Sequence, residues 1–493
     1  MMQKIHSLLF ENTSTKQTIL KNTFWLTAGN TASRILRAVL ILYAARILGT
    51  EGYGIFSYVL SVAAFFTVLS DIGLSSLLTR ESVRQPEKVK SYLSTTLAMK
   101  LGLIALTVLI TVIGAPYFVK IDAALPLIPF IAVLLALDSL RNFAYSIARA
   151  ENRMQFEAGF MMLTDICITG IGLAVLFLNP SAEGITIAYT AGSAIGTIAA
   201  FTALRRELGG LISYFDRTLI RPIFSAAWPF AVMSILGGFM INIDTIIIGI
   251  FRSASELGLY AAAQRPIQIL YLIPALVATS IFPIISRHAH RGEMKESKTI
   301  LENTLVATLA LGIPVTVGGI VVGAPLIILL FGEAYIGSVL AFQLLMVTVP
   351  MIFIGTIVGN TIFAHDRQRV FIVSTGSGAV ANVILDFILI PIYGIAGSAV
   401  ATIIAQFFTN GLNWEFLQKI YHLTIFRRLL RILAASTVMG IAAWIMNAAG
   451  IHVLATVAVA SIIYAALLVV LREPLLDFLR PKLNAVAEEV IQG

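Results

Sequence analysis

Residues 21–84 read KNTFWLTAGNTASRILRAVLILYAARILGTEGYGIFSYVLSVAAFFTVLSDIGLSSLLTRESVR. The stretch is apolar over residues 24–48 and again over residues 55–78, with a short turn at residues 49–54 between the two runs. Since about 20 apolar residues are enough to cross a hydrocarbon core of roughly 30 Å, each run has the length of a membrane-spanning helix. The stretch therefore predicts two transmembrane helices joined by a tight hairpin.

Charged side chains interrupt both of these predicted helices. Arg34 and Arg37 lie one helical turn apart, near mid-depth of the first helix, and Asp71 lies inside the second. A buried arginine costs about 2.5–3.5 kcal/mol on insertion scales, so the pair is expected to face a wet cavity and not lipid. The arginine pair is the strongest pointer to function in the sequence.

The composition of the whole chain agrees with a membrane protein. Of its 493 residues, 58% are hydrophobic and only 12% are charged, and the mean hydropathy is +0.91. Soluble domains carry about 25% charged residues. The single cysteine, Cys167, excludes an intramolecular disulfide. The first apolar run, residues 5–10, is too short for a cleavable signal peptide, so the first long helix is expected to stay as an anchor.

Apolar runs between charged or Pro/Gly breaks predict about fourteen spans. Most of the 34 lysines and arginines fall on one side of these alternating spans, which makes the net charge of +8 an orientation signal and not a sign of nucleic-acid binding. Both termini are therefore expected to be cytoplasmic. The predicted spans are residues 22–48, 54–79, 93–115, 124–148, 158–178, 184–204, 222–250, 258–285, 299–323, 337–364, 370–390, 394–417, 429–449 and 452–471.

A weak internal repeat suggests how the spans are grouped. Sliding the chain by 204 residues places Gly54-Ile55-Phe56 on Gly258-Leu259-Tyr260, at the start of the second and eighth spans. We predict an all-α integral membrane protein with two six-helix lobes, residues 1–210 and 211–420, followed by an appended helix pair and cytoplasmic tail, residues 421–493. The arginine pair has no counterpart in the second lobe.

Six stretches of the chain are distinctive: Lys21-Asn22-Thr23-Phe24-Trp25, Ala45-Arg46-Ile47-Leu48-Gly49, Glu51-Gly52-Tyr53-Gly54, Asp71-Ile72-Gly73-Leu74, Ala381 to Asp386, and Ile390 to Ala399. They resemble bacterial and archaeal polysaccharide-transporter flippases, which include O-antigen and exopolysaccharide flippases. These belong to the multidrug/oligosaccharidyl-lipid/polysaccharide exporter superfamily. The resemblance implies a V-shaped pair of lobes around a central cavity, and a glycan on a polyprenyl diphosphate as the cargo.

Four arginines are candidate substrate-binding residues. Arg34 and Arg37 share a helix face and suit a diphosphate or an acidic sugar, because guanidinium groups donate bidentate hydrogen bonds and stay charged. The alternative is that they pair with acids such as Asp71 and only fix helix packing. Arg141 extends the cationic surface near the cytoplasmic entrance, or is neutralised by Asp138 three residues earlier.

The other intramembrane cations are Arg265 and Lys100. Arg265 lies near the outer end of the eighth span and is expected to receive cargo in the outward-facing state. Lys100 lies about two turns into the third span, where it either lines the cavity or extends its ammonium group to the interface.

Four intramembrane carboxylates, Asp71, Asp165, Asp244 and Asp386, are candidates for coupling to H+ or Na+. Salt bridges to arginines of facing helices are the equally weighted alternative. No Walker loop and no Cys or His pair with metal-ligand spacing occurs in the sequence, so we expect no cofactor and no metal.

The sequence therefore predicts a transporter and not an enzyme. We expect a flippase in the cytoplasmic membrane that moves lipid-linked oligosaccharide to the outer leaflet by alternating access, alongside proteins of polysaccharide biosynthesis and without nucleic acid. The first alternative is a multidrug or metabolite antiporter, which would need an acidic cavity to take cationic drugs. A membrane polysaccharide polymerase or ligase is the second, and it would need a long outer loop that the sequence lacks.

Overall fold

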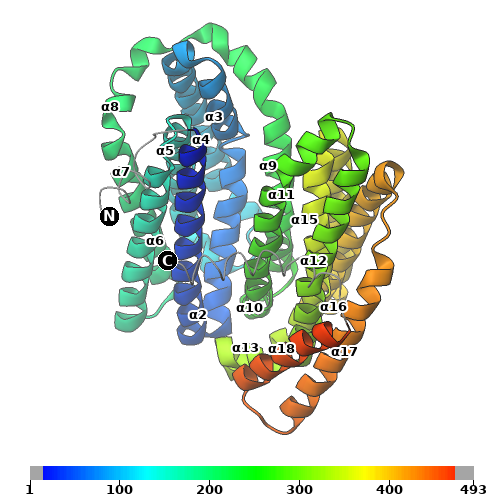
Figure 1. The fold of residues 1–493 in the computed structure, drawn as a ribbon. Coiled ribbons are helices and arrows are strands. Elements are labelled where there is room, and N and C mark those ends of the chain that lie inside the picture. The colour runs from blue at the N-terminus through cyan, green and yellow to red at the C-terminus, as the bar shows by residue number, and fades with distance from the viewer. Residues whose placement is uncertain (1–14, 472–493) are drawn as a thin grey trace, which may run out of the picture. The chain divides into compact units, whose positions relative to one another are not determined.

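The computed structural model describes residues 15–471, and every regular element in that part of the chain is a helix (Figure 1). The predicted all-α membrane fold class is confirmed. The predicted cytoplasmic tail after residue 471 and the first apolar run, residues 5–10, lie outside the described residues. The chain divides into two compact units, Met1–Gly258 (unit 1) and Leu259–Gly493 (unit 2).

Unit 1 holds the first helices and the linker that follows them. Its last element, α10, begins at Ala254 and continues into unit 2. The α-helices are α2 (Thr15–Leu69), α3 (Leu74–Arg84), α4 (Val89–Phe118), α5 (Ile128–Ala150), α6 (Met154–Leu178), α7 (Ala182–Ala203), α8 (Arg205–Leu208), α9 (Ile220–Phe251) and α10 (Ala254–Leu270), with 3-10 turns η1 (Pro86–Lys88), η2 (Asp122–Leu127), η3 (Leu211–Tyr214) and η4 (Arg217–Leu219).

Unit 2 holds the remaining helices and one 3-10 turn. These are α11 (Leu272–His290), α12 (Met294–Val321), α13 (Gly323–Phe331), η5 (Glu333–Ser338), α14 (Val339–Met346), α15 (Thr348–Ala364), α16 (Gln368–Tyr421), α17 (Phe426–Ala448) and α18 (Val453–Val470).

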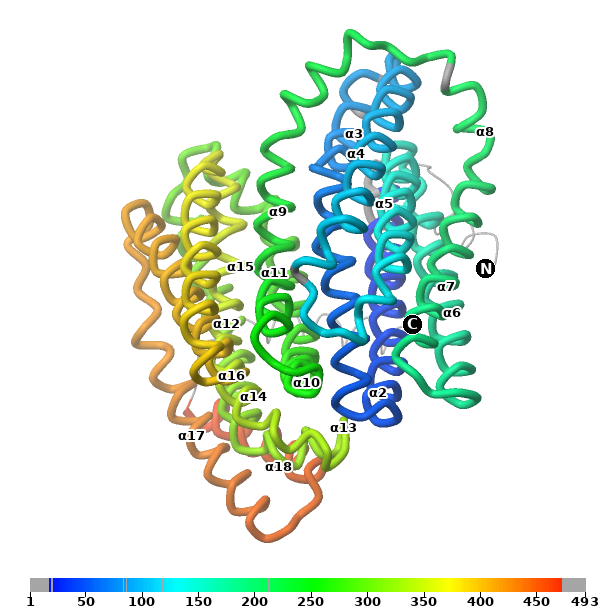
Figure 2. The backbone as a smooth tube through the Cα atoms, turned by 180° about the vertical axis from the view of Figure 1, so that it is seen from behind, coloured from blue at the N-terminus to red at the C-terminus, as the bar shows by residue number. Residues whose placement is uncertain are grey.

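Two helices are far too long for one membrane crossing. At 1.5 Å per residue, α2 with 55 residues and α16 with 54 residues each exceed twice a hydrocarbon core of roughly 30 Å. Each contains one non-helical glycine, Gly49 with φ 68° and Gly394 with φ 60°. Figures 1 and 2 show the α2 chain reversing at its kink. The predicted turn at residues 49–54 is therefore shorter than expected, since a single glycine in the left-handed region makes it.

The described residues contain 11 helices long and apolar enough to cross a membrane, or 12 if the bent pair formed by α14 and α15 is one span. Counting the two halves of α2 and of α16 separately would raise the larger of these totals to the predicted number. The count of about fourteen remains a prediction.

The second predicted span, residues 54–79, is interrupted. Helix α2 ends at Leu69 and α3 begins at Leu74, so Asp71 lies in a break and not inside a continuous helix.

The outward faces of the long helices are apolar. In α4 only 22% of the most apolar window is buried inside the protein. Leu106, Leu109 and Ile113 on this helix are each at least half exposed. An apolar face of this length is stable only against hydrocarbon, which agrees with a multi-pass membrane protein.

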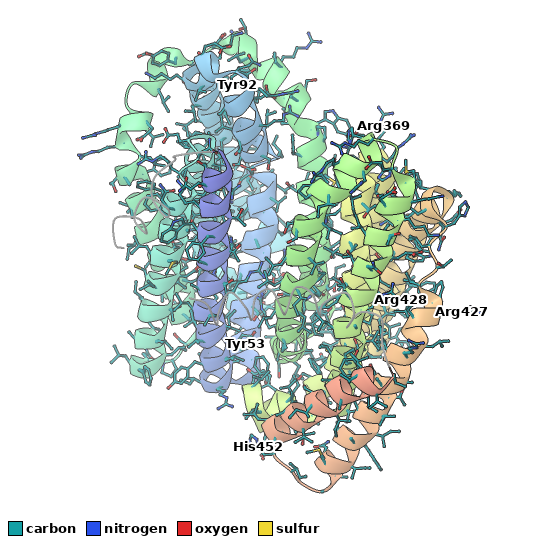
Figure 3. All side chains as sticks on the ribbon, viewed as in Figure 1. Tyr53, Tyr92, Arg369, Arg427, Arg428 and His452 are labelled. Carbon is teal, nitrogen blue, oxygen red and sulfur yellow. The ribbon has the colours of Figure 1, made fainter. Side chains whose placement is uncertain are left out.

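Residues that the predicted alternation of spans places on opposite sides of the membrane lie at opposite ends of each unit. Tyr53, next to the first hairpin, and Tyr92, at the start of α4, lie at opposite ends of unit 1 (Figure 3). Within unit 2, Arg369 at the start of α16 and His452 before α18 also lie at opposite ends (Figure 3).

The linker between α7 and α9 runs over one end of unit 1 and is fixed to α4 (Figure 2). Thr95 on α4 donates to the carbonyl of Asp216 at 3.3 Å and accepts from its backbone N–H at 3.1 Å. The predicted lobe boundary at residue 210 falls within this linker. The division into residues 1–210, 211–420 and 421–493 remains a prediction.

The positions paired by the 204-residue offset contact one another within unit 1. A Cβ on Gly54 would overlap the carbonyl oxygen of Ala254, and a Cβ on Gly258 would overlap the carbonyl oxygen of Thr50. The hydroxyls of Thr50 and Ser255 lie 2.7 Å apart at the same crossing. The contacts are reciprocal, because Thr50 corresponds to Ala254 and Gly54 to Gly258 under the offset, as expected for a two-fold related pair of helix starts.

Candidate functional site

Arg37 is held by a carboxylate from a distant part of the sequence. Its Nε donates to Oδ1 of Asp165 on α6 at 2.6 Å. The Asp165 side chain is fully buried, whereas 42% of the Arg37 side chain remains exposed. The alternative in which an arginine of the pair is held by an acid therefore applies to Arg37, but the acid is Asp165 and not Asp71. The salt bridge to a facing helix that was the alternative for Asp165 is present. This ion pair uses only the Nε–H of the guanidinium, and within residues 15–471 the Nη donors make no hydrogen bond.

Arg34 lies one turn before Arg37 on α2 and is exposed. Within residues 15–471 it makes no hydrogen bond or ion pair. The two arginines therefore differ: Arg37 is oriented by a buried acid, and the charge of Arg34 is not compensated by the described residues.

Arg141 is neutralised within a three-residue network. It donates through Nη2 to Asp138 at 2.6 Å and through Nη1 to the Ser193 hydroxyl at 2.5 Å. Ser193, on α7, donates in turn to the same oxygen of Asp138 at 2.8 Å. Arg141 is only 8% exposed. Mutual neutralisation with Asp138, the alternative that the sequence left open, is what the structure has.

These two ion pairs belong to one polar cluster, which consists of Arg37, Asp138, Arg141, Asp165 and Ser193. Arg37 interacts electrostatically with Asp138 as well as Asp165, and Arg141 interacts with Arg37. Helices α2, α5, α6 and α7 bring the cluster together inside unit 1. The formal charges of the cluster sum to zero, and Arg34 beside it adds one positive charge.

Sequence reasoning missed the residues of α7 that complete this site. Ser193 bridges Asp138 and Arg141, and Tyr189 lies within electrostatic reach of both Arg37 and Arg141. Gly192 and Gly196 were the only signal in the sequence that α7 packs closely on another helix. A Cβ on Gly192 would lie 2.6 Å from the Ile168 nitrogen, and one on Gly196 would overlap Thr164, so both glycines let α7 approach α6 beside Asp165.

Lys100 neither lines a cavity nor extends to the interface. It is fully buried, and its ammonium group forms an ion pair with Asp71 and donates to the Ser75 hydroxyl at 2.9 Å. The prediction for Lys100 is therefore wrong in both of its forms. Its long side chain reaches inward because an acid and a hydroxyl are available at the break between α2 and α3.

The remaining candidates lie apart from the polar cluster in sequence and element. Arg265 on α10 donates through Nη1 to Gln268 at 3.2 Å, and its buried Nε has no hydrogen-bond partner among the described residues. Asp244 on α9 is 2% exposed and Asp386 on α16 is fully buried. Arg265 and Asp386 belong to unit 2.

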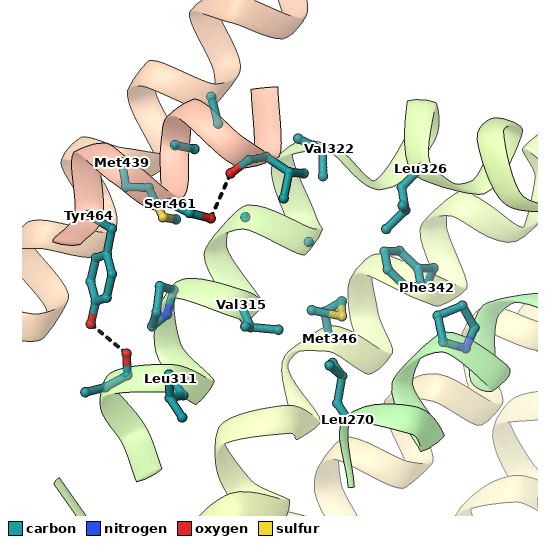
Figure 4. Close-up of a pocket in the computed structure, with 18 residues that line it drawn as sticks. Leu270, Leu311, Val315, Val322, Leu326, Phe342, Met346, Met439, Ser461 and Tyr464 are labelled. Atoms are coloured by element: carbon teal, nitrogen blue, oxygen red, sulfur yellow. Dashed lines mark hydrogen bonds between the residues drawn. The ribbon is translucent and has the colours of Figure 1, made fainter. Parts of the chain in front are cut away.

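Unit 2 contains an apolar pocket of about 410 Å³ (Figure 4). Its two hydroxyl groups are already engaged, since Tyr464 donates to the Ala310 carbonyl and Ser461 to the Val457 carbonyl. The pocket offers no donor to an anion, so it suits hydrocarbon and not a phosphate. Its lining includes Leu270, Leu311, Val315, Leu326, Phe342, Met346 and Met439.

Comparison with solved structures agrees with the fold. The chain is similar to a structure described as lipid II flippase MurJ in the inward closed conformation, with a TM-score of 0.76, 16% identity, and coverage of 91% of this chain and 99% of that one. It is also similar to an inward-facing multidrug resistance MATE family transporter of the MOP superfamily, with a TM-score of 0.63, 15% identity, and coverage of 79% and 95%. At these identities the likeness concerns the fold alone.

Sequence comparisons find relatives named as flippases and transporters. The chain is 25% identical to the probable low-salt glycan biosynthesis flippase Agl15 of Haloferax volcanii, over 73% of this chain and 75% of that protein. It is 21% identical to a putative O-antigen transporter of Shigella flexneri, over 78% of this chain and 94% of that protein. The family model described as polysaccharide biosynthesis protein matches residues 19–289, which is more than half of the chain. The chain therefore belongs to the polysaccharide biosynthesis protein family.

Proposed function

We propose that this protein is a flippase that moves polyprenyl-diphosphate-linked oligosaccharide from the inner to the outer leaflet of the cytoplasmic membrane by alternating access. The observation that carries the proposal is the exposed Arg34 next to the partly exposed Arg37, which is oriented by the buried carboxylate of Asp165. Relatives named as a probable glycan biosynthesis flippase and a putative O-antigen transporter support the cargo class.

The arginine pair suits a diphosphate for electrostatic reasons. The polar cluster is neutral in itself, so the charge of Arg34 and the exposed edge of Arg37 give this part of unit 1 a net attraction for anions. Guanidinium groups bind phosphate oxygens bidentately and keep their charge when partly desolvated. In this proposal Arg34 and Arg37 hold the diphosphate and Arg265 receives it in the outward-facing state, while Arg141 is neutralised by Asp138 and does not contact the cargo.

The acids divide into two groups in this proposal. Asp71 and Asp165 hold Lys100 and Arg37, so their role is to compensate protein charges. Coupling to H+ or Na+ is assigned to Asp244 and Asp386, both deeply buried. We further propose that the protein acts as a transporter and not an enzyme, and that both termini are cytoplasmic.

Replacing both arginines tests the proposal, provided that Asp165 is not left as a buried, uncompensated acid. We therefore compare Arg34→Ala/Arg37→Ala/Asp165→Asn with Asp165→Asn alone, in cells that depend on this protein for glycan export. Charge-assisted hydrogen bonds contribute about 1.5–3 kcal/mol each, so loss of the two arginine contacts to the cargo should reduce export by about a hundredfold or more.

Arg217→Ala/Arg221→Ala is the matched control, since it removes two exposed arginines, one in η4 and one in the first turn of α9. This control should keep most of the export. Wild-type levels of export by the triple variant, at equal expression, would remove the arginine pair from the mechanism. Loss of drug resistance and not of glycan export in a deletion strain would favour the multidrug antiporter, the first alternative from the sequence.

A further inference from the structure

The second membrane helix of unit 1 is broken in an energetically unfavourable conformation. Between the end of α2 at Leu69 and the start of α3 at Leu74, Ile72 has φ 36° and Gly73 has φ 75°. Glycine adopts the left-handed region freely, but a β-branched residue such as isoleucine does so only under strain. Strained residues persist where the surrounding structure holds them, and they are common in segments that switch conformation.

A single buried lysine bridges the two sides of this break. Lys100 extends from α4 and pairs with Asp71, inside the break, and with the hydroxyl of Ser75 in the first turn of α3. Ser75 also donates to Asp71 at 2.6 Å, which closes a three-membered network. The cation lies near the C-terminal end of α2, where the helix dipole favours positive charge.

Two other helices, α5 and α9, contact the break. The Ser139 hydroxyl on α5 donates to the Ser70 carbonyl at 3.4 Å. A Cβ on Gly73 would lie 2.5 Å from Cβ of Phe230 and 2.7 Å from the nitrogen of Ala231, so the backbone of α9 is packed directly on the break. This contact follows Pro229, which lacks an N–H and weakens the helical hydrogen bonding of α9 at the same level.

The burial of the ion pair is unequal, which suggests how it opens. Lys100 is fully buried, whereas the Asp71 side chain is 18% exposed. Packed apolar residues would hold a break that never moves as well as an ion pair does, or better, because burying two charges carries a desolvation cost. An ion pair with one accessible partner can instead be broken and reformed, since Asp71 can leave Lys100 when α2 and α3 realign.

We propose that Lys100 is a positioning residue of the transport cycle, which acts through Asp71 to hold the second span in its broken form until α2 and α3 realign. Realignment releases Ile72 from the left-handed region and separates Asp71 from Lys100. The proposal rests on the proposed function for its cargo, but the two-state break is a property of the protein without cargo.

A double variant that removes both charges of the ion pair distinguishes this role from simple structural support. Lys100→Met should lower the yield of folded protein, because it strands Asp71, and Lys100→Met/Asp71→Asn should restore the yield. Export by the double variant should stay at least tenfold below wild type, because the break is no longer held by a contact that opens and reforms. Full recovery of both yield and export would show that the pair is only structural and would overturn the proposal.

Ile72→Gly provides a test that does not depend on the folding of the charge variants. Glycine removes the strain of the broken form and should raise the thermal midpoint while lowering export several-fold. Export equal to that of wild type would contradict a working hinge. Gly102→Ala on α4, where a Cβ meets no atom within 4 Å, is a control that should alter neither measurement by much.

Amide hydrogen exchange of residues 70–77, measured without cargo, keeps this proposal separate from the proposed function. Wild-type protein should show two exchanging populations in this segment, and Ile72→Gly should show one. Identical exchange in both proteins would overturn the hinge. Wild-type protein that has the two populations but exports no glycan would refute the proposed function and leave the hinge supported.

Discussion

Replacing Gly54 with alanine is expected to disrupt unit 1 strongly. The new Cβ would overlap the Ala254 carbonyl, which is backbone and cannot move aside as a flexible side chain can. Overpacking of this kind costs about 1–3 kcal/mol or more. The detergent-solubilised protein should therefore unfold at a midpoint lower by roughly 5 °C.

The reciprocal glycine provides a check on the mechanism. Gly258→Ala should have a similar effect, because its Cβ would overlap the Thr50 carbonyl. The double variant should lose less than the sum of the two, since the first methyl group already separates the helices and neighbouring sites are not additive. Gly170→Ala on α6 meets no atom within 4 Å and is the matched control. If neither Gly54→Ala nor Gly258→Ala changed the unfolding midpoint, a close helix crossing at this point would be contradicted.

The membrane character and the helical hairpins of this fold could be predicted from the sequence, because long apolar runs satisfy one simple length rule. The exact turns could not. Gly49 and Gly394 each turn the chain alone, whereas the sequence around Gly49 also offers Gly52 and Gly54 as turn residues. Only the packed structure decides that Gly54 is helical and is needed for the crossing with α10.

The break between α2 and α3 was missed for a related reason. The residues around it, Ile72-Gly73-Leu74, continue the apolar run, and isoleucine is not expected at a positive φ. Asp71 was the only nearby residue that could have indicated a break in the helix. Its meaning depends on Lys100, which approaches from another helix.

Ion pairs could be predicted within one helix but not between helices. The spacing of Asp138 and Arg141 places both on one helix face, and they are paired. The partner of Arg37 is 128 residues away, and the sequence does not say at what depth α6 presents Asp165 beside α2. The depth and rotation of each helix are set by small residues such as Gly192 and Gly196, which sequence patterns show but do not place.

Loss of Arg37 alone should destabilise the protein, and loss of its partner as well should restore stability without restoring transport. Arg37→Ala leaves Asp165 fully buried without its cation. Removing one partner of a buried pair costs about 3–5 kcal/mol, and the partial exposure of Arg37 favours the lower end. Arg37→Ala/Asp165→Leu removes both charges and should return the midpoint of thermal unfolding close to that of wild type.

Export should follow Arg37 and not stability across this set of variants. Asp165→Asn keeps an acceptor for the Nε of Arg37, so it should retain most of the export and lose about 1 kcal/mol of stability. Arg37→Ala/Asp165→Leu should be stable yet export poorly, because the guanidinium that binds the anionic cargo is absent. Export that rises and falls with the unfolding midpoint would instead assign Arg37 to helix packing. An Arg37→Ala protein as stable as wild type would show that Asp165 does not depend on this arginine, and the orientation of the arginine pair would then need another cause.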